Sequence, residues 1–79
     1  MVRAYIEVDM KATGRRISEL RMDRDITNQE LAEMLGVTVQ ALGKWQTGKG
    51  LPRLTIALLL ADVFGVHVED LVAYRTRRE

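Results

Sequence analysis

The stretch "TNQELAEMLGVTVQALGKWQ", residues 27–46, contains the signals for two short helices separated by a very brief joint. Thr27 can cap the first helix with its hydroxyl group, and Glu30, three residues later, can accept a hydrogen bond from the backbone of the cap residue. Gly36 is suited to end that helix, because glycine tolerates the positive φ of a helix C-terminus. Thr38 then offers an N-cap for a second helix. Two helices joined so closely must cross at a steep angle, so the stretch predicts a helix-turn-helix.

The remaining sequence predicts three further helices. A helical period covers Thr13 to Arg24, with Ile17 and Leu20 facing inward. After a loop rich in glycine, residues 54–64 have the pattern of a longer helix, and "VEDLVAY", residues 68–74, has that of a fifth. In the longer helix, the spacing of apolar residues predicts a core face made of Leu54, Leu58, Ala61 and Phe64.

The N-terminal sequence "VRAYIEVD", residues 2–9, alternates in a way that is typical of a half-buried strand. A lone strand cannot satisfy its backbone, so this one needs a partner, which could be a second copy of the chain or the chain's own fifth helix. We therefore expect an all-α fold of five helices with a short N-terminal β-strand. Its expected parts are an arm over residues 1–12, a helical domain over 13–74, and a basic, frayed C-terminal tail over 75–79.

Composition excludes several classes of protein. Seventy-nine residues form one domain with a core near the lower limit for independent stability. The chain has no cysteine and one histidine, His67, so we expect no disulfide, no metal site and no cofactor. No catalytic set can be assembled around a single histidine, so we do not expect an enzyme. The longest apolar run is too short to cross a bilayer and no signal-peptide layout is present, so we expect a cytoplasmic protein without membrane contact.

The charges are unevenly distributed although the net charge is only +1. No aspartate or glutamate occurs between Met34 and Ala61, where the only charged residues are Lys44, Lys49 and Arg53. One contiguous region is therefore positive while the rest of the chain is balanced.

These residues resemble the phage-repressor-like helix-turn-helix family typified by Cro and the lambda repressor, often called Xre-type. The matching residues are Ile17, Leu20, Arg21, "TNQELA" at 27–32, "LGVT" at 35–38, "KWQTGK" at 44–49, Pro52 and "LADVFGV" at 60–66. The resemblance covers residues 14–72. It implies a lambda-repressor-like DNA-binding domain in a transcriptional regulator, expected to be a repressor, that reads the major groove of double-stranded DNA with the helix over 39–46.

The residues expected to contact bases follow from which side of this helix is buried. Leu42 and Trp45 are spaced to face the core. The outward face, and so the expected set of base contacts, is Val39, Gln40, Gly43 and Lys44. Glutamine can read adenine, valine can touch a thymine methyl group, and lysine can reach a guanine edge or a phosphate. The glycine would let the helix approach DNA closely, although simple tolerance of an exposed glycine is an alternative.

The resemblance also suggests which residues contact phosphates. The expected set is Arg21, Asn28, Thr47, Gly48 and Lys49. The backbone N–H groups at 28 and at 47–48 are expected to be donors. Two positions depart from the family pattern: Asn28 replaces a usual glutamine, and Gln46 replaces a glutamate that would pair with Arg21. We expect Arg21 to donate a hydrogen bond to neutral Gln46 and to be freer to bind phosphate.

A second apolar stripe in the helix over 54–64, together with the unpaired strand, favours a homodimer. The expected interface is Val2, Ala4, Ile6, Val8, Ile56, Leu59 and Val63. Such dimers read two half-sites about 34 Å apart, so the operator is expected to be an inverted repeat. The alternative function is a helix-turn-helix protein-interaction module, an adaptor or antitoxin, with weak or no DNA binding. The low net charge and the departures at positions 28 and 46 favour that alternative.

Overall fold

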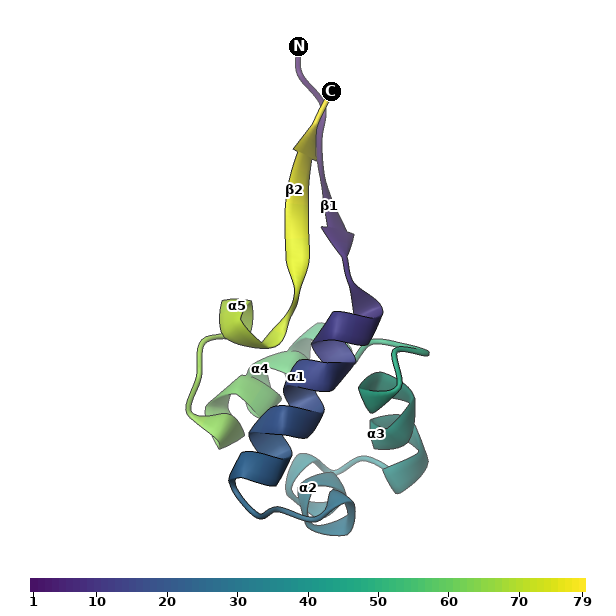
Figure 1. Ribbon diagram of the computed structural model, residues 1–79, viewed down its shortest axis with the longest axis vertical. Helices are drawn as coiled ribbons and strands as arrows, with labels where there is room; N and C mark the ends of the chain where they lie inside the picture. The colour runs from purple at the N-terminus through teal and green to yellow at the C-terminus, as the bar shows by residue number, and fades with distance from the viewer.

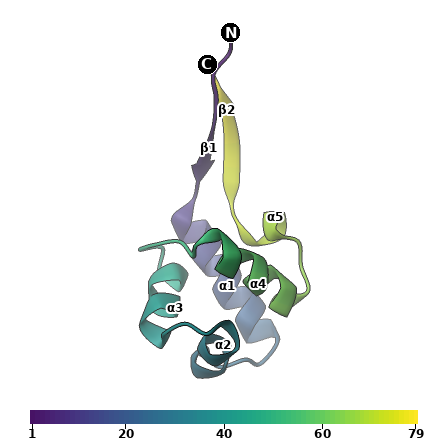
Figure 2. The ribbon, with the colours of Figure 1, turned by 180° about the vertical axis from the view of Figure 1, so that it is seen from behind.

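The computed structural model describes residues 1–79 and consists of five helices and a two-stranded β-ribbon (Figure 1). The elements are β1 (Ala4–Val8), α1 (Met10–Asp23), α2 (Asn28–Leu35), α3 (Val39–Gln46), α4 (Leu54–Phe64), α5 (Val68–Leu71) and β2 (Tyr74–Arg78). The helices enclose one core, and the ribbon projects from one end of the helical domain, so the molecule measures 47 × 23 × 20 Å. The view from behind places both chain termini at the tip of the ribbon (Figure 2).

The N-terminal strand pairs within the chain, and its partner is the C-terminal segment. β1 and β2 are antiparallel, with a register that runs from Ala4 opposite Arg78 to Val8 opposite Tyr74. The expectation of a frayed tail over 75–79 is therefore wrong, and neither a second copy nor the fifth helix is needed to pair β1. The polar sequence "RTRRE" does not have the alternating apolar pattern of a strand. Every residue of the ribbon is exposed, so burial does not require apolar residues in β2.

Three hydrogen bonds organise the base of the ribbon, and two of them involve residues of α1. Asp9 caps α1 by accepting a bond from the N–H of Ala12, so the helix begins at Met10, three residues earlier than expected. The N–H of Asp9 donates to the carbonyl of Ala73, and the N–H of Ala73 donates to the buried hydroxyl group of Thr13. Because this pairing needs an extended chain, α5 ends at Leu71 and does not continue to residue 74.

The core is formed mainly by α1, α2, α3 and α4, with one residue from α5. Its buried apolar members are Ile17, Leu31, Ala32, Leu35, Leu42, Ile56, Leu60, Phe64 and Leu71. None of the five helices combines the length and the apolarity that crossing a bilayer requires.

The inward face of α4 differs from the expected one. Ala61 and Phe64 are buried as expected, but Leu54 and Leu58 are exposed, Leu54 by 73%. Ile56, expected at a dimer interface, is only 8% exposed and belongs to the core, and Val63 packs against the core. The sequence "LTIALLLADVF" is apolar almost all round, so its periodicity does not select one face. Of the second stripe, only Leu59 remains accessible for an interface.

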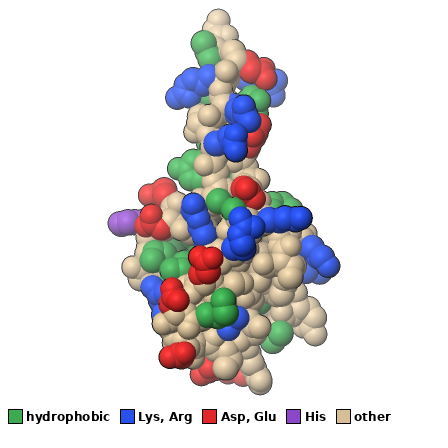
Figure 3. Space-filling model, in the orientation of Figure 1, with side chains coloured by type: hydrophobic (Ala, Val, Ile, Leu, Met, Phe, Trp, Pro, Cys, Tyr) green, Lys and Arg blue, Asp and Glu red, His purple; other side chains and the backbone are tan.

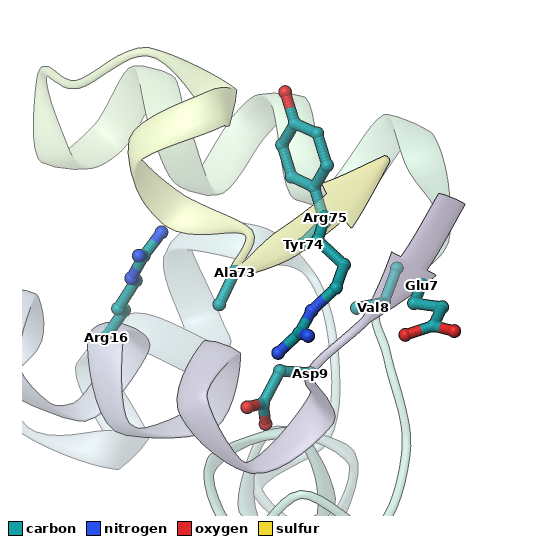
Figure 4. Close-up of a pocket in the computed structure, with 7 residues that line it drawn as sticks. All are labelled: Glu7, Val8, Asp9, Arg16, Ala73, Tyr74 and Arg75. Atoms are coloured by element: carbon teal, nitrogen blue, oxygen red, sulfur yellow. The ribbon is translucent and has the colours of Figure 1, made fainter. Parts of the chain in front are cut away.

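A polar hollow of about 440 Å³ lies at the base of the ribbon (Figure 4). It is lined by Glu7, Val8, Asp9, Arg16, Ala73, Tyr74 and Arg75. Arg75 extends toward Asp9, whereas the ring of Tyr74 points to the opposite side of the strand. Two arginines and two carboxylates balance each other there, so the hollow has no charge preference for an anionic or a cationic ligand.

Candidate nucleic-acid interface

The turn between α2 and α3 has the caps that the sequence predicts. The hydroxyl group of Thr27 accepts a bond from the N–H of Glu30, whose carboxylate accepts one from the N–H of Thr27, which completes the capping box. Gly36 has φ 68° and ends α2 in the left-handed conformation. Thr38 caps α3 by accepting from the N–H of Ala41. These caps end α2 and begin α3 with only three residues, 36–38, between them, so the two helices form the predicted helix-turn-helix.

α3 has a buried face and an open face. Leu42 is fully buried and Trp45 packs partly buried against the core, as expected. The residues expected to contact bases lie on the opposite face: Val39, Gln40, Gly43 and Lys44. The side chains of Gln40 and Lys44 are exposed and make no hydrogen bond within the chain, and no atom lies within 4 Å of the position that a Cβ at Gly43 would occupy. The structure therefore brings these four positions together on one accessible surface.

Two glycines set how closely α3 lies against α1. A Cβ at Gly14 would lie 2.4 Å from the carbonyl oxygen of Trp45 and 2.6 Å from that of Gln46, so only glycine permits this contact. Gly48 has φ 75°, and a Cβ there would lie 2.7 Å from Cγ of Lys11. Gly14 was not among the residues expected in the site. A glycine inside a helical pattern was the available signal, because such a glycine often marks a close approach of two backbones.

The side chain of Gln46 connects α3 to α1 and α2. Its Oε1 accepts bonds from the hydroxyl group of Ser18 at 2.9 Å and from Nε of Arg21 at 3.2 Å. Its Nε2 donates to Oδ1 of Asn28 at 2.8 Å. The predicted bond between Arg21 and Gln46 is confirmed, whereas the contributions of Ser18 and Asn28 were not predicted. A single neutral amide thus fixes three elements relative to one another.

The position of Arg21 is more constrained than the sequence suggested. Arg21 is partly buried, and its second bond runs from Nη1 to the carbonyl of Ile26 at 2.8 Å. Only Nη2 has no hydrogen-bond partner in the chain. Arg21 therefore mainly supports the loop before α2, and the NH₂ group at Nη2 remains for an anion.

The first turn of α2 presents free N–H donors to solvent. The backbone N–H groups of Asn28 and Gln29 have no acceptor within the chain. Asn28 uses its carbonyl oxygen for Gln46, so its side-chain NH₂ group also points away from the chain. A helix N-terminus with free donors attracts anions. The backbone N–H of Thr27, and to a lesser degree its hydroxyl group, lower the pKa of the nearby Glu30, so this carboxylate stays ionised in the capping box.

The segment after α3 differs from expectation. The N–H groups of Thr47 and Gly48, expected to be free donors, bond to the carbonyls of Gly43 and Trp45 at 3.1 and 3.2 Å. The hydroxyl group of Thr47 also donates to the carbonyl of Gly43. These bonds satisfy the last turn of α3, so the two amides are not available to a phosphate. The exposed side chain of Lys49 is the remaining donor of this segment.

The open face of α3 has no acidic side chain; it includes Lys44, and Lys49 follows shortly after the end of the helix. Lys and Arg side chains gather on the α3 side of the helical domain, whereas Asp and Glu gather toward α2 and α5, and the ribbon carries both kinds (Figure 3). The surface beside α3 is therefore the part of the helical domain best suited to a polyanion.

Comparison with known proteins agrees with this geometry. A helix-turn-helix family model matches residues 17–71. The chain is 31% identical over 58 residues to the HTH-type transcriptional activator BcrR of Enterococcus faecalis, a match that covers 73% of this chain and 28% of BcrR. The chain belongs to the helix-turn-helix family, in the Cro-like group that its motifs resemble.

Two solved structures show the same fold. The restriction-modification controller protein C.AhdI from Aeromonas hydrophila has a TM-score of 0.74 and 25% identity, covering 80% of this chain and 96% of that one. SinR, a master regulator for biofilm formation solved in complex with DNA, has a TM-score of 0.69 and 27% identity, covering 75% and 95%. Among three curated relatives, all named as transcriptional regulators, the match spans between 18% and 55% of their length.

Proposed function

We propose that this chain is part of a sequence-specific regulator of transcription, a repressor, which binds double-stranded DNA as a homodimer with α3 in the major groove. The observation that carries the proposal is the open face of α3, where Gln40 and Lys44 have no partner within the chain and no carboxylate intervenes. Unpartnered polar groups on a rigid, capped helix are what direct reading of base edges requires. Its family membership and its likeness to SinR, solved with DNA, support the same conclusion.

In this proposal the four residues of the open face divide the reading of bases. The amide of Gln40, one residue into α3, donates to and accepts from adenine, and Val39 contacts a thymine methyl group. Lys44, one turn later, reaches a guanine edge or a phosphate. Gly43 has no side chain to hold the helix away from the DNA, so the backbone of α3 lies close to the floor of the groove.

Phosphate contacts hold the helix in register. The N–H groups of Asn28 and Gln29, the side-chain NH₂ of Asn28 and the ammonium group of Lys49 are the proposed donors. Arg21 contributes through Nη2. Thr47 and Gly48 act indirectly, because their internal bonds fix the segment that carries Lys49. These contacts carry no sequence information and make binding depend on salt.

A homodimer of such domains reads an inverted repeat with half-sites about one helical turn apart. Repression then needs only occupancy of the operator.

The experiment that tests this function is selection of bound sequences from a random duplex pool, followed by titration of the selected duplex at several salt concentrations. We expect an inverted repeat to be enriched and the affinity to fall steeply between low and moderate salt, as release of counterions requires. A protein-interaction module, an adaptor or antitoxin, would enrich no sequence and bind duplex weakly at every salt concentration, and that result would refute the proposal.

A further inference from the structure

The two faces of the β-ribbon differ in chemistry. Cross-strand partners lie on the same face of an antiparallel pair. The register therefore puts Ala4, Ile6, Val8, Tyr74, Thr76 and Arg78 on one face, and Tyr5, Glu7, Arg75 and Arg77 on the other. On the second face Arg77 pairs with Glu7 at 3.3 Å. The first face, named here the apolar ribbon face, is exposed to solvent, Ile6 by 55%.

The apolar ribbon face continues onto the helical domain. A shallow hollow of about 370 Å³ separates it from α5 and is lined by Ile6, Val8, Val68, Glu69, Val72 and Tyr74. Five of these six side chains are hydrophobic. Val68 and Val72 also border a second apolar hollow beside Leu51 and Leu54. A continuous apolar surface thus runs from the ribbon to the start of α4, which a small monomer seldom leaves bare.

The area of the molecule indicates that a partner covers this surface. The accessible surface is 5474 Å² for a mass of 9.0 kDa, whereas a compact monomer of that mass exposes about 4,900 Å². The excess of roughly 600 Å² approaches the ~800 Å² that each partner buries in a standard interface. An isolated two-stranded ribbon is also only marginally stable, so a third layer on one face would stabilise it.

We infer that the apolar ribbon face is the interface of the homodimer, and that two ribbons stack on these faces in opposite directions about a two-fold axis near Ile6. This inference rests on the proposed function, because it names the surface through which the proposed dimer forms. A two-fold contact joins the same patch on both protomers, so the patch must complement itself. Stacking in opposite directions meets that condition, because the tip of one ribbon then lies over the base of the other.

The charges at the two ends of this face support the same arrangement. Arg78 lies at the tip of the ribbon and Glu69 borders the hollow at its base, and neither forms an ion pair within its own chain. Opposed stacking brings Arg78 of one protomer over the hollow that Glu69 of the partner subunit borders. Ala4, opposite Arg78, enters the same hollow and covers Val68 and Val72. Ribbons stacked in the same direction would instead place the two Arg78 side chains together, which is unfavourable.

The test compares Ile6→Lys with Tyr5→Lys by sedimentation equilibrium in the absence of DNA. Both positions lie on β1 and are exposed, but they point to opposite faces of the ribbon, so the pair isolates the face as the variable. We expect the parent and Tyr5→Lys to be dimers at tens of micromolar. Ile6→Lys should raise the dissociation constant roughly 100-fold, since it buries two unpaired charges at the axis. Equal association of the two variants, or a monomeric parent, would overturn the inference.

Three further variants keep the test decisive. If circular dichroism reports that Ile6→Lys is unfolded, Thr76→Lys adds the same charge directly across the ribbon at a position already polar. For the direction of stacking, Arg78→Glu and Glu69→Arg should each weaken the dimer, and the two together should restore it. Failure to restore it would exclude the opposed arrangement.

Dimer formation through the ribbon and DNA binding by α3 can be tested independently. Ile6→Lys should bind a duplex containing one half-site as the parent does, because position 6 is remote from α3. A dimeric parent without duplex binding would refute the proposed function while leaving the interface intact. If Ile6→Lys instead lost affinity for the single half-site and the parent were monomeric, the ribbon would contact DNA and the interface would be refuted.

Discussion

The side-chain amide of Gln46 donates a 2.8 Å hydrogen bond to the Oδ1 atom of Asn28, across the gap between α3 and α2. The direction of this bond is fixed by Arg21, which can only donate and therefore takes the Oε1 of Gln46. Asn28 must then turn its own NH₂ group outward, beside the free N–H groups of the α2 N-terminus. The identity of residue 46 thus decides whether residue 28 offers donors or an acceptor to a bound phosphate.

Gln46→Glu should weaken duplex binding about five- to tenfold without unfolding the protein, because one hydrogen bond is worth about 1 kcal/mol. A glutamate would pair with Arg21 but would attract the NH₂ group of Asn28, which would turn the Oδ1 of Asn28 toward the phosphate. Fluorescence anisotropy with the selected duplex measures the loss, and thermal denaturation checks the fold.

The control for this prediction is the same substitution in an Asn28→Ala background, where residue 28 has no side-chain amide that could reorient. There, Gln46→Glu should change affinity by less than about twofold, since the two residues act as one unit. If Gln46→Glu lowered the affinity for the duplex as much in that background, residue 46 would act on DNA binding without involving Asn28.

Gly14→Ala should lower the free energy of unfolding by about 2 kcal/mol or more, although alanine is the better helix former. The added Cβ would fall 2.4 Å from the carbonyl oxygen of Trp45, and a backbone atom cannot yield as a flexible side chain can. Urea denaturation measures the change. A variant as stable as the parent would mean that α1 and α3 can move apart at little cost.

Gly43→Ala distinguishes two explanations for the glycine in α3: a requirement for close approach to DNA, and simple tolerance of glycine at an exposed position. No atom lies near the added methyl group, so helix propensity should raise the free energy of unfolding by up to about 1 kcal/mol. If α3 lies against the floor of the groove, the same variant should bind the operator at least about tenfold more weakly. Gain of stability without loss of affinity would favour tolerance.

The sequence was sufficient to predict the elements whose boundaries depend on local chemistry. The caps at Thr27 and Thr38 and the left-handed Gly36 act within a few residues, so the helix-turn-helix was predictable from neighbouring side chains. The inward direction of Leu42 and Trp45 followed from their spacing along a short helix. The predicted bond between Arg21 and Gln46 came from a family resemblance, and the structure confirms it.

The remaining features depend on contacts between distant parts of the chain. β2 has no apolar alternation to reveal it, because both of its faces are exposed and its order comes from pairing with β1. α4 is apolar on nearly every side, so its packing against α2 and α5, and not its own pattern, decides that Ile56 is buried and Leu58 is not. The engagement of Asn28 by Gln46 spans eighteen positions and required the folded arrangement of α2 and α3.

Glu30→Gln should lower the free energy of unfolding at neutral pH, and this difference from the parent should vanish in acid. The folded pKa of Glu30 lies below its usual value because of the hydrogen bonds from Thr27, so the ionised carboxylate stabilises the fold above the pKa of the unfolded chain, about 4.3. That contribution is lost as the pH falls through the lower folded pKa. Urea titrations of parent and variant at several pH values should therefore converge as the pH falls below the pKa of the unfolded carboxyl group.

Glu33→Gln is the matched control for this pH dependence, since Glu33 lies on the same helix and its carboxylate forms no hydrogen bond or ion pair within the chain. It removes the same charge without opening the capping box and should leave stability at neutral pH close to that of the parent. A difference between parent and Glu30→Gln that did not change with pH would contradict the assigned role of the carboxylate.

Gln40→Ala and Lys49→Ala should damage DNA binding in different ways. Gln40→Ala removes a bidentate contact to one base pair and should cost about 1 to 3 kcal/mol on the selected operator, with little change on operators altered at that pair. Lys49→Ala removes a phosphate contact, so every duplex should be bound more weakly by a similar factor and the slope of affinity against salt should become flatter by about one unit. Anisotropy titrations over a panel of single-base operator variants at two or more salt concentrations separate the two effects. If both variants bound every duplex as the parent does, the open face of α3 would not be the reading surface.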